Sequence, residues 1–136
     1  MATVTVTEES FEATTQQGIV LLDWWAAWCG PCRAFGPIYE AASERHADVV
    51  FGKIDTEAEQ ALASGMDIRS IPTLMVFRDG ILLFSEAGVL PGPVLDQLIG
   101  KVKDLDMDVV RREIATAQAA GDAGGTPDPG SSGAPA

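Results

Sequence analysis

The sequence has two cysteines, and they stand three positions apart in Trp28-Cys29-Gly30-Pro31-Cys32. The apolar run Ile19–Trp25 precedes them without polar alternation, which predicts a strand buried on both faces. Residues 33–46 follow with apolar side chains at helical spacing. A disulfide that closes so short a loop would constrain the unfolded chain very little. Two thiols between a buried strand and a helix therefore indicate redox chemistry more than structural cross-linking.

Zinc binding is the other common use of a Cys-x-x-Cys pair. A structural zinc site takes four ligands, usually from two such pairs or from added histidines. This chain offers two cysteines and one histidine, His46, which stands at the far end of the predicted helix. We therefore expect no metal site within a single chain.

The chain is acidic, with 20 acidic and 9 basic residues and a net charge of -11. Nucleic acids and anionic membranes bind positive surfaces, so neither is an expected partner. No apolar stretch approaches the roughly 20 residues of a membrane-spanning helix. The segment Met1–Ser10 lacks the basic and apolar regions of a secretory signal. These features predict a monomeric, cytoplasmic protein, a setting where such a dithiol is catalytic or metal-binding rather than structural.

Strands and helices are expected to alternate along most of the chain. The expected strands are Thr3–Thr7, Ile19–Trp25, Val49–Ile54, Thr73–Phe77 and Ile81–Phe84. The expected helices lie between Thr7 and Gly18, over 33–46, over Glu57–Gly65 and after Pro91-Gly92-Pro93. The dipeptide Asp79-Gly80 predicts a tight hairpin between the last two strands. This order predicts an α/β fold with parallel strands joined by helices and an antiparallel edge.

Three segments of different composition divide the chain. Residues 1–105 carry the strands and helices of the predicted core domain. Asp106 is an expected cap for an additional helix within residues 106–120. Residues 121–136 are almost entirely Gly, Pro, Ser, Ala, Thr and Asp, without a side chain that could anchor a core. We predict that this last segment is a disordered tail.

Further residues stand at fixed distances from the cysteines. In chain order they are Asp23, six residues before Cys29, Pro37, five residues after Cys32, Lys53, Ile71-Pro72-Thr73 and Gly88. Together with the cysteine pentapeptide, they make the segment from about Val4 to Leu105 resemble the thioredoxin family. The resemblance implies the thioredoxin fold, a central mixed five-stranded sheet flanked by helices. It also implies that no cofactor is bound beyond a redox-active disulfide.

Cys29 is expected to be the nucleophile. It precedes the helix, so its sulfur can lie near unpaired N–H groups and the positive end of the helix dipole. Both effects lower the pKa of a thiol, as thioredoxins themselves illustrate. Cys32, one turn further along, is expected to be more buried and to resolve the mixed disulfide with a target.

Asp23 interrupts an apolar run, where burial should raise the pKa of its carboxyl group. With the family spacing, this predicts a general base that takes the proton of Cys32, directly or through water. The alternative is an aspartate at a strand end in solvent. Lys53 is expected to pair with Asp23 and tune it, and a solvated lysine on a strand is the alternative.

The resemblance implies that the Ile71–Pro72 peptide bond is cis and lies beside the dithiol, whereas an ordinary turn proline would be trans. A shallow apolar patch around Cys29 would suit many extended or unfolded substrates at modest affinity. The expected substrate-binding residues of this patch are Trp28, Gly30, Pro31, Ile71, Pro72, Gly88 and Val89.

The expected function is protein-disulfide reduction by an electron carrier of cell redox homeostasis. The resemblance implies disulfide-containing target proteins and re-reduction by an NADPH-dependent flavoprotein, thioredoxin reductase. One alternative is an oxidising or isomerising protein of the same fold, which Gly30-Pro31 and the missing signal sequence count against. The other is a binding role, in which the fold acts as a subunit or adaptor and the C-terminal segment docks.

Overall fold

The computed structural model describes residues 2–124 of the chain. These residues form two compact units, one ending at Lys103 and the other beginning at Asp104. The first unit contains the sheet, four helices and both cysteines. The second unit is a single helix in its described part.

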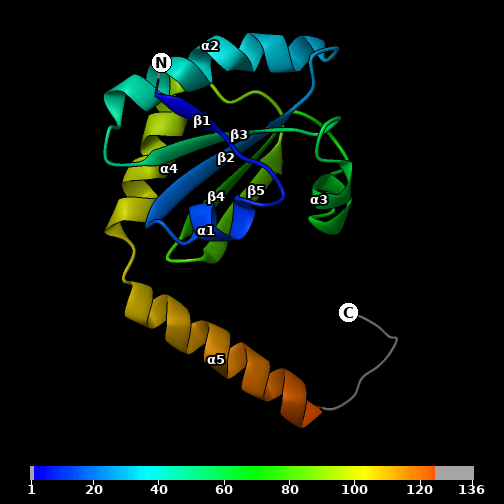
Figure 1. The fold of residues 1–136 in the computed structure, drawn as a ribbon. Helices are drawn as coiled ribbons and strands as arrows, with labels where there is room; N and C mark the ends of the chain where they lie inside the picture. The colour runs from blue at the N-terminus through cyan, green and yellow to red at the C-terminus, as the bar shows by residue number, and fades with distance from the viewer. Residues whose placement is uncertain (1, 125–136) are drawn as a thin grey trace. The chain divides into compact units, whose positions relative to one another are not determined.

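The first unit is built on a five-stranded mixed sheet (Figure 1). The strands are β1 (Thr3–Thr5), β2 (Ile19–Trp25), β3 (Val50–Asp55), β4 (Thr73–Arg78) and β5 (Ile81–Ala87). Their order in the sheet is β1-β3-β2-β4-β5. β1, β3 and β2 run parallel, and β4 and β5 are antiparallel to their neighbours. The predicted fold class, a mixed sheet with an antiparallel edge, is confirmed.

The four helices of this unit cover both faces of the sheet. They are α1 (Phe11–Thr15), α2 (Gly30–Arg45), α3 (Gln60–Gly65) and α4 (Gly92–Asp104). The helices α2 and α4 pack on one face, and α1 and α3 pack on the other (Figure 1). The strand β2 is central and is buried on both faces, which explains why its sequence is apolar apart from Asp23.

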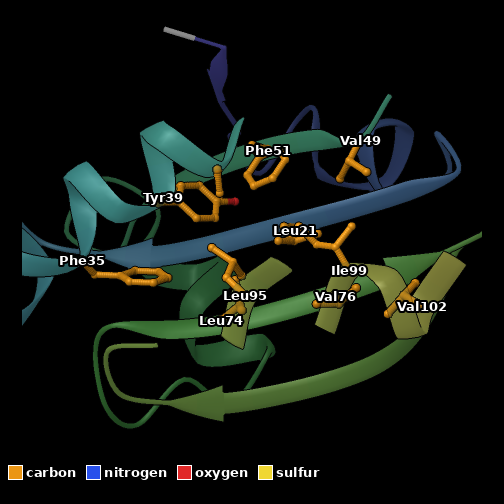
Figure 2. Close-up of a cluster of buried hydrophobic side chains, with 11 residues drawn as sticks. Leu21, Phe35, Tyr39, Val49, Phe51, Leu74, Val76, Leu95, Ile99 and Val102 are labelled. Atoms are coloured by element: carbon orange, nitrogen blue, oxygen red, sulfur yellow. The ribbon is translucent and has the colours of Figure 1, made fainter. Parts of the chain in front are cut away.

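Side chains of β2 alternate between two hydrophobic clusters, as the pleat of a strand requires. Leu21 points into the cluster under α2 and α4, where Phe35, Tyr39, Leu95 and Ile99 are fully buried (Figure 2). The other cluster lies under α1 and α3 and contains Val6, Val20, Leu22, Trp24, Ile54, Ala63, Met75 and Phe77. The two clusters bury β2 on both faces, and the loop that follows β2 leads directly to the cysteines.

Several element boundaries differ from the sequence prediction, and three of the differences have local reasons. The first helix begins at Phe11 rather than after Thr7, because Thr7 and Ser10 close a turn in which the Ser10 Oγ accepts the Thr7 N–H at 3.0 Å. The third helix begins at Gln60, because Asp55 accepts the N–H of Glu57 at 2.9 Å and holds residues 56–58 as a turn. The fifth strand continues to Ala87, one residue before a glycine with positive φ.

The second unit contains α5 (Met107–Gly124). Asp106 Oδ1 accepts the N–H groups of Asp108 at 3.0 Å and Val109 at 3.3 Å, which satisfies two otherwise unpaired donors of the first turn. The helix passes Ala120 and includes four residues of the segment predicted to be disordered, so that prediction is wrong for residues 121–124. Once a helix is nucleated, each added residue costs little. The rest of the predicted tail, residues 125–136, lies outside the described residues.

Candidate active site

The two cysteines occupy the start of α2 and form a disulfide, with 5.2 Å between their Cα atoms. Cys29 is the N-cap residue, in an extended conformation, and its Sγ accepts the N–H of Cys32 at 3.2 Å. Pro31 lies in the first turn, where a helix has no need of its missing N–H. The sulfur of Cys29 therefore takes the place of a capping oxygen, facing the positive end of the helix dipole.

Both cysteines are almost fully buried in this oxidised state, with Cys29 4% and Cys32 6% exposed. The prediction that Cys32 is the more buried of the two is therefore wrong here. Cys29 loses its access to water because it packs with Ala26 and Ile71. Its Sγ lies 3.7 Å from the carbonyl oxygen of Ile71. What distinguishes the two sulfurs is position at the cap rather than exposure.

The loop before β4 lies against Cys29. The Ile71–Pro72 peptide bond is cis, as the family resemblance implied. The N–H of Gly88 donates to the carbonyl oxygen of Pro72 at 2.8 Å, which joins the end of β5 to this loop. Gly88 has φ +114°, a conformation that residues with a Cβ rarely adopt. Glycine at this position therefore lets the chain turn where the two loops meet.

The residues predicted to bind substrate differ in exposure. Trp28 is 67% exposed and Val89 39% exposed, and Gly30, Pro31 and Gly88 are exposed as well. Ile71 is partly buried and Pro72 is buried, so Pro72 contributes mainly to the shape of the loop.

The indole of Trp28 is held in place by Glu57, whose Oε2 accepts the Nε1–H at 3.3 Å. A depression beside the indole is lined by Trp28, Thr56, Ala63, Ile68, Arg69, Ser70 and Ile71. Only Trp28 and Ile71 of this set were predicted from the sequence as binding residues. The others come from the segment before α3, from α3 and from the loop after it. Of these segments, the sequence linked only the Ile71-Pro72-Thr73 part of that loop to the cysteines.

Asp23 lies in the middle of β2 and is 1% exposed. Burial is the main cause that raises its pKa to about 7, with the negative charge of Glu40 adding to the effect and Lys53 opposing it. Its Oδ1 has no hydrogen-bond partner among the described residues. The alternative of a solvent-exposed aspartate is excluded. A carboxyl group that titrates near neutral pH can both accept and release a proton under working conditions.

Lys53 is the neighbour of Asp23 across β2 and β3, and the two residues are partners in the register. Within the described residues, however, its ion pair is with Glu40, at 4.0 Å from Nζ to Oε2. The ammonium group also lies 5.2 Å from the centre of the Trp25 ring. The expected pairing of Lys53 with Asp23 is therefore wrong as an ion pair, because the ion pair of Lys53 is with Glu40. The positive charge of Lys53 nevertheless lowers the pKa of Asp23, as the expected tuning requires.

His46, the only histidine, contacts Asp96 at 2.8 Å rather than the cysteines. Within residues 2–124, no three His, Cys, Asp or Glu side chains converge as metal ligands would. No helix in that range has the length and apolar character needed to cross a membrane.

The comparisons with known proteins point in one direction. The thioredoxin family model matches residues 2–115. The chain is 50% identical over 119 residues to the Streptomyces coelicolor protein named "Putative thioredoxin 2", covering 87% of this chain and 89% of the relative. It is 39% identical over 102 residues to thioredoxin of Bacillus subtilis, covering 74% of this chain and 98% of the relative.

Solved structures agree with the sequence relatives. A mutant thioredoxin from Halobacterium salinarum matches with a TM-score of 0.70 and 32% identity, over 76% of this chain and 92% of that one. Thioredoxin of Plasmodium falciparum matches with a TM-score of 0.66 and 30% identity, over 73% of this chain and 97% of that one.

The sheet order, the capped disulfide and the cis-proline loop are those of a thiol-disulfide oxidoreductase with the thioredoxin fold. The family match spans most of the chain, and its relatives are covered over almost their whole length. The chain belongs to the thioredoxin family. Its activity is thiol-disulfide exchange at the Cys29–Cys32 pair.

Proposed function

We propose that this protein is a cytoplasmic reductant of protein disulfides, re-reduced by a thioredoxin reductase, with Cys29 as the attacking thiol. The observation that carries the assignment is the position of the Cys29 sulfur at the helix cap, 3.2 Å from the Cys32 nitrogen. A thiolate in that place would accept the same N–H and face the same dipole, so its pKa would be lowered. Cys32, within the helix, takes the resolving role.

The exchange proceeds in two balanced steps. The Cys29 thiolate attacks one sulfur of the target disulfide, the target S–S bond breaks, and the departing target thiolate takes up a proton. The Cys32 thiol loses its proton and, as a thiolate, attacks the Cys29 sulfur, which breaks the mixed disulfide and releases the second target thiolate, and this thiolate also takes up a proton. The target gains two electrons and two protons, and the Cys29–Cys32 pair loses them as it becomes a disulfide.

Asp23 serves as the base of the second step. The thiol of Cys32 has to lose its proton before it attacks, and a buried thiol has little contact with bulk water. The Asp23 carboxylate, with a pKa of about 7, can take that proton directly or through a water molecule. Lys53 favours the ionised form of Asp23 through its positive charge.

The target chain binds around the sulfur of Cys29. Trp28, Pro31, Ile71 and Val89 offer apolar surface, and Gly30 and Gly88 keep side chains away from the approaching backbone. Pro72 shapes the loop whose preceding carbonyl, that of Ile71, lies beside the sulfur. Such a surface recognises an extended segment by shape and apolar contact, so many different targets fit.

The reduction potential of the Cys29–Cys32 pair in a glutathione buffer tests this direction of electron flow. For a reductant we expect a value near the family reference of about -270 mV. Strongly oxidising proteins of the same fold have a reduction potential of about -120 mV, and a value near that would mean that the protein donates disulfides instead. A second measurement asks whether NADPH and a thioredoxin reductase reduce the disulfide in a coupled assay. Failure of that turnover would remove the reductase from the proposal.

A further inference from the structure

Glu40 is a second carboxylate beside Asp23, and no sequence pattern singles it out. It lies on α2, the helix that begins at the cysteines, and its side chain is 23% exposed. Its Oε2 accepts the hydroxyl of Thr3 at 2.9 Å, and its Oε1 is buried without a hydrogen-bond partner among the described residues. The carboxylate is therefore fixed from β1 and faces inward.

Lys53 lies between two carboxylates that compete for its charge. On the sheet it is the direct register partner of Asp23. Its ammonium nevertheless lies 4.0 Å from Glu40 Oε2 and stands over the ring of Trp25. An ammonium held by one carboxylate stabilises the ionised form of another less than it would if the two were in contact.

We propose that Glu40 is a positioning residue for the exchange reaction: it holds the Lys53 ammonium away from Asp23 and thereby sets the pH at which Asp23 accepts the proton of Cys32. The link to Cys32 rests on the function proposed above. The effect of Glu40 on Asp23 does not, because it follows from the placement of the three charged groups alone.

Besides Lys53 and Glu40, the groups that face Asp23 in the described chain are uncharged. Its neighbour on β4 is Leu74, which is apolar, and the cysteines carry no charge while they form a disulfide. From α2 the phenol of Tyr39 also faces inward and donates to the carbonyl oxygen of Gly52 at 2.8 Å. Burial raises the pKa of that phenol well above its ordinary value, so Tyr39 stays neutral. Lys53 and Glu40 are thus the charges that act on Asp23 within residues 2–124.

The Glu40→Gln variant removes the charge and keeps the shape of the side chain. Two effects then act in the same direction: Asp23 loses a negative neighbour, and the Lys53 ammonium is released towards it. The pKa of Asp23 should fall by about half a unit or more. The oxidised protein is the right state for the measurement, because the cysteines do not titrate there. Carbon-13 NMR of the Asp23 carboxyl group during a pH titration gives the midpoint.

Glu44→Gln is the matched control. It removes the same charge from the same helix, at an exposed position that is not among the charges acting on Asp23. In this control variant, the titration midpoint of Asp23 should equal that of the unsubstituted protein. An unchanged or raised midpoint in Glu40→Gln, or an equal shift in both variants, would overturn the proposal.

The contribution of Lys53 is isolated by repeating the titration in a Lys53→Gln background. With no ammonium to release, Glu40→Gln should lower the midpoint less than it does in the presence of Lys53. An equal or larger shift in this background would mean that Glu40 does not act by holding Lys53.

The rate at which Cys32 resolves a mixed disulfide on Cys29 tests the link to catalysis. For a fall of about half a unit in the pKa of Asp23, Glu40→Gln should be about two- to threefold faster at pH 6 and unchanged at pH 8. If the NMR midpoint moves and the rate profile does not, the influence of Glu40 on Asp23 stands. The role of Asp23 as the base is then wrong.

Discussion

The sulfur of Cys29 caps the helix that carries Cys32, with 3.2 Å between Cys29 Sγ and the Cys32 nitrogen. This relationship makes the two cysteines inequivalent although both are almost fully buried. The cap position favours negative charge on Cys29, because the first-turn N–H groups of a helix have no other acceptor. The order that we propose for the two chemical steps rests on that asymmetry.

The variant Cys32→Ser should accumulate covalent complexes with target proteins through Cys29, because the first step remains and the resolving thiol is gone. The variant Cys29→Ser should accumulate few, since the remaining thiol lies inside the helix. Non-reducing electrophoresis of each variant after incubation with a disulfide-bonded protein measures the difference. Equal trapping by the two variants would contradict the assignment of roles.

Replacing Asp23 with asparagine should stabilise the oxidised protein at alkaline pH. The pKa of Asp23 rises from 3.8 to about 7 on folding, so the folded state binds the proton more tightly than the unfolded state. Stability therefore falls as pH rises between these two values and stays level above the upper one. The asparagine side chain carries no charge to bury, and Asp23→Asn should gain about 3–4 kcal/mol at pH 8.

The same comparison at pH 4 is the control for that prediction, because Asp23 is then neutral in the folded protein. Denaturant unfolding of both proteins at the two pH values measures the free energies. The advantage of the variant should almost vanish at pH 4. A gain of similar size at both values would show that packing, rather than the buried charge, causes it.

Trp28→Ala should slow the reduction of protein disulfides about three- to tenfold and change stability little, because the indole is 67% exposed. A small disulfide such as hydroxyethyl disulfide should be reduced at nearly the original rate, since it needs little binding surface. Val4→Ala is the control, an exposed apolar side chain on β1 outside the proposed patch. Equal losses on both substrates would place Trp28 in the chemistry rather than in target binding.

Gly52 is required by packing rather than by backbone conformation. A Cβ built there lies 2.7 Å from Val6 Cγ2 and 2.9 Å from Leu22 Cδ2. Gly52→Ala should therefore destabilise the protein by about 1–3 kcal/mol. Gly36→Ala is the matched control. Gly36 lies on α2, and a Cβ built there has no atom within 4 Å. Alanine is also more favourable than glycine within a helix by about 1 kcal/mol. The midpoint temperature of thermal unfolding should fall in Gly52→Ala and rise in Gly36→Ala.

Truncation after Leu105 should leave disulfide reduction within about twofold of the full chain, because every proposed site residue lies in the first compact unit. We propose that residues 106–136 are an addition to the reductase domain. The measurement is turnover of a protein disulfide together with cooperative unfolding of the shortened chain. A large loss of either would make the second unit part of the working enzyme.

Sequence patterns anticipated most of the fold because they reflect burial. The apolar run of β2, interrupted only by Asp23, predicted a central strand covered on both sides, and that is where the strand lies. The boundaries of α1 and α3 were misplaced, because the side chains of Ser10 and Asp55 form local turns that spacing alone does not reveal. The last turn of α5 was missed, because composition describes the average behaviour of a segment rather than the end of one helix.

Redox chemistry could be predicted from the order of the residues, which places a dithiol at a helix start and a carboxylate in an apolar strand. The proline loop beside the dithiol was implied by the family resemblance. Which groups touch one another depends instead on how the elements pack. Thr3, Glu40 and Lys53 come from β1, α2 and β3. The packing of α2 on the sheet brings the Glu40 carboxylate to the Thr3 hydroxyl and the Lys53 ammonium. Long-range electrostatic neighbours depend on distances between elements, and a linear pattern records distances along the chain. For that reason the partner of Lys53 could be learned only from the folded protein.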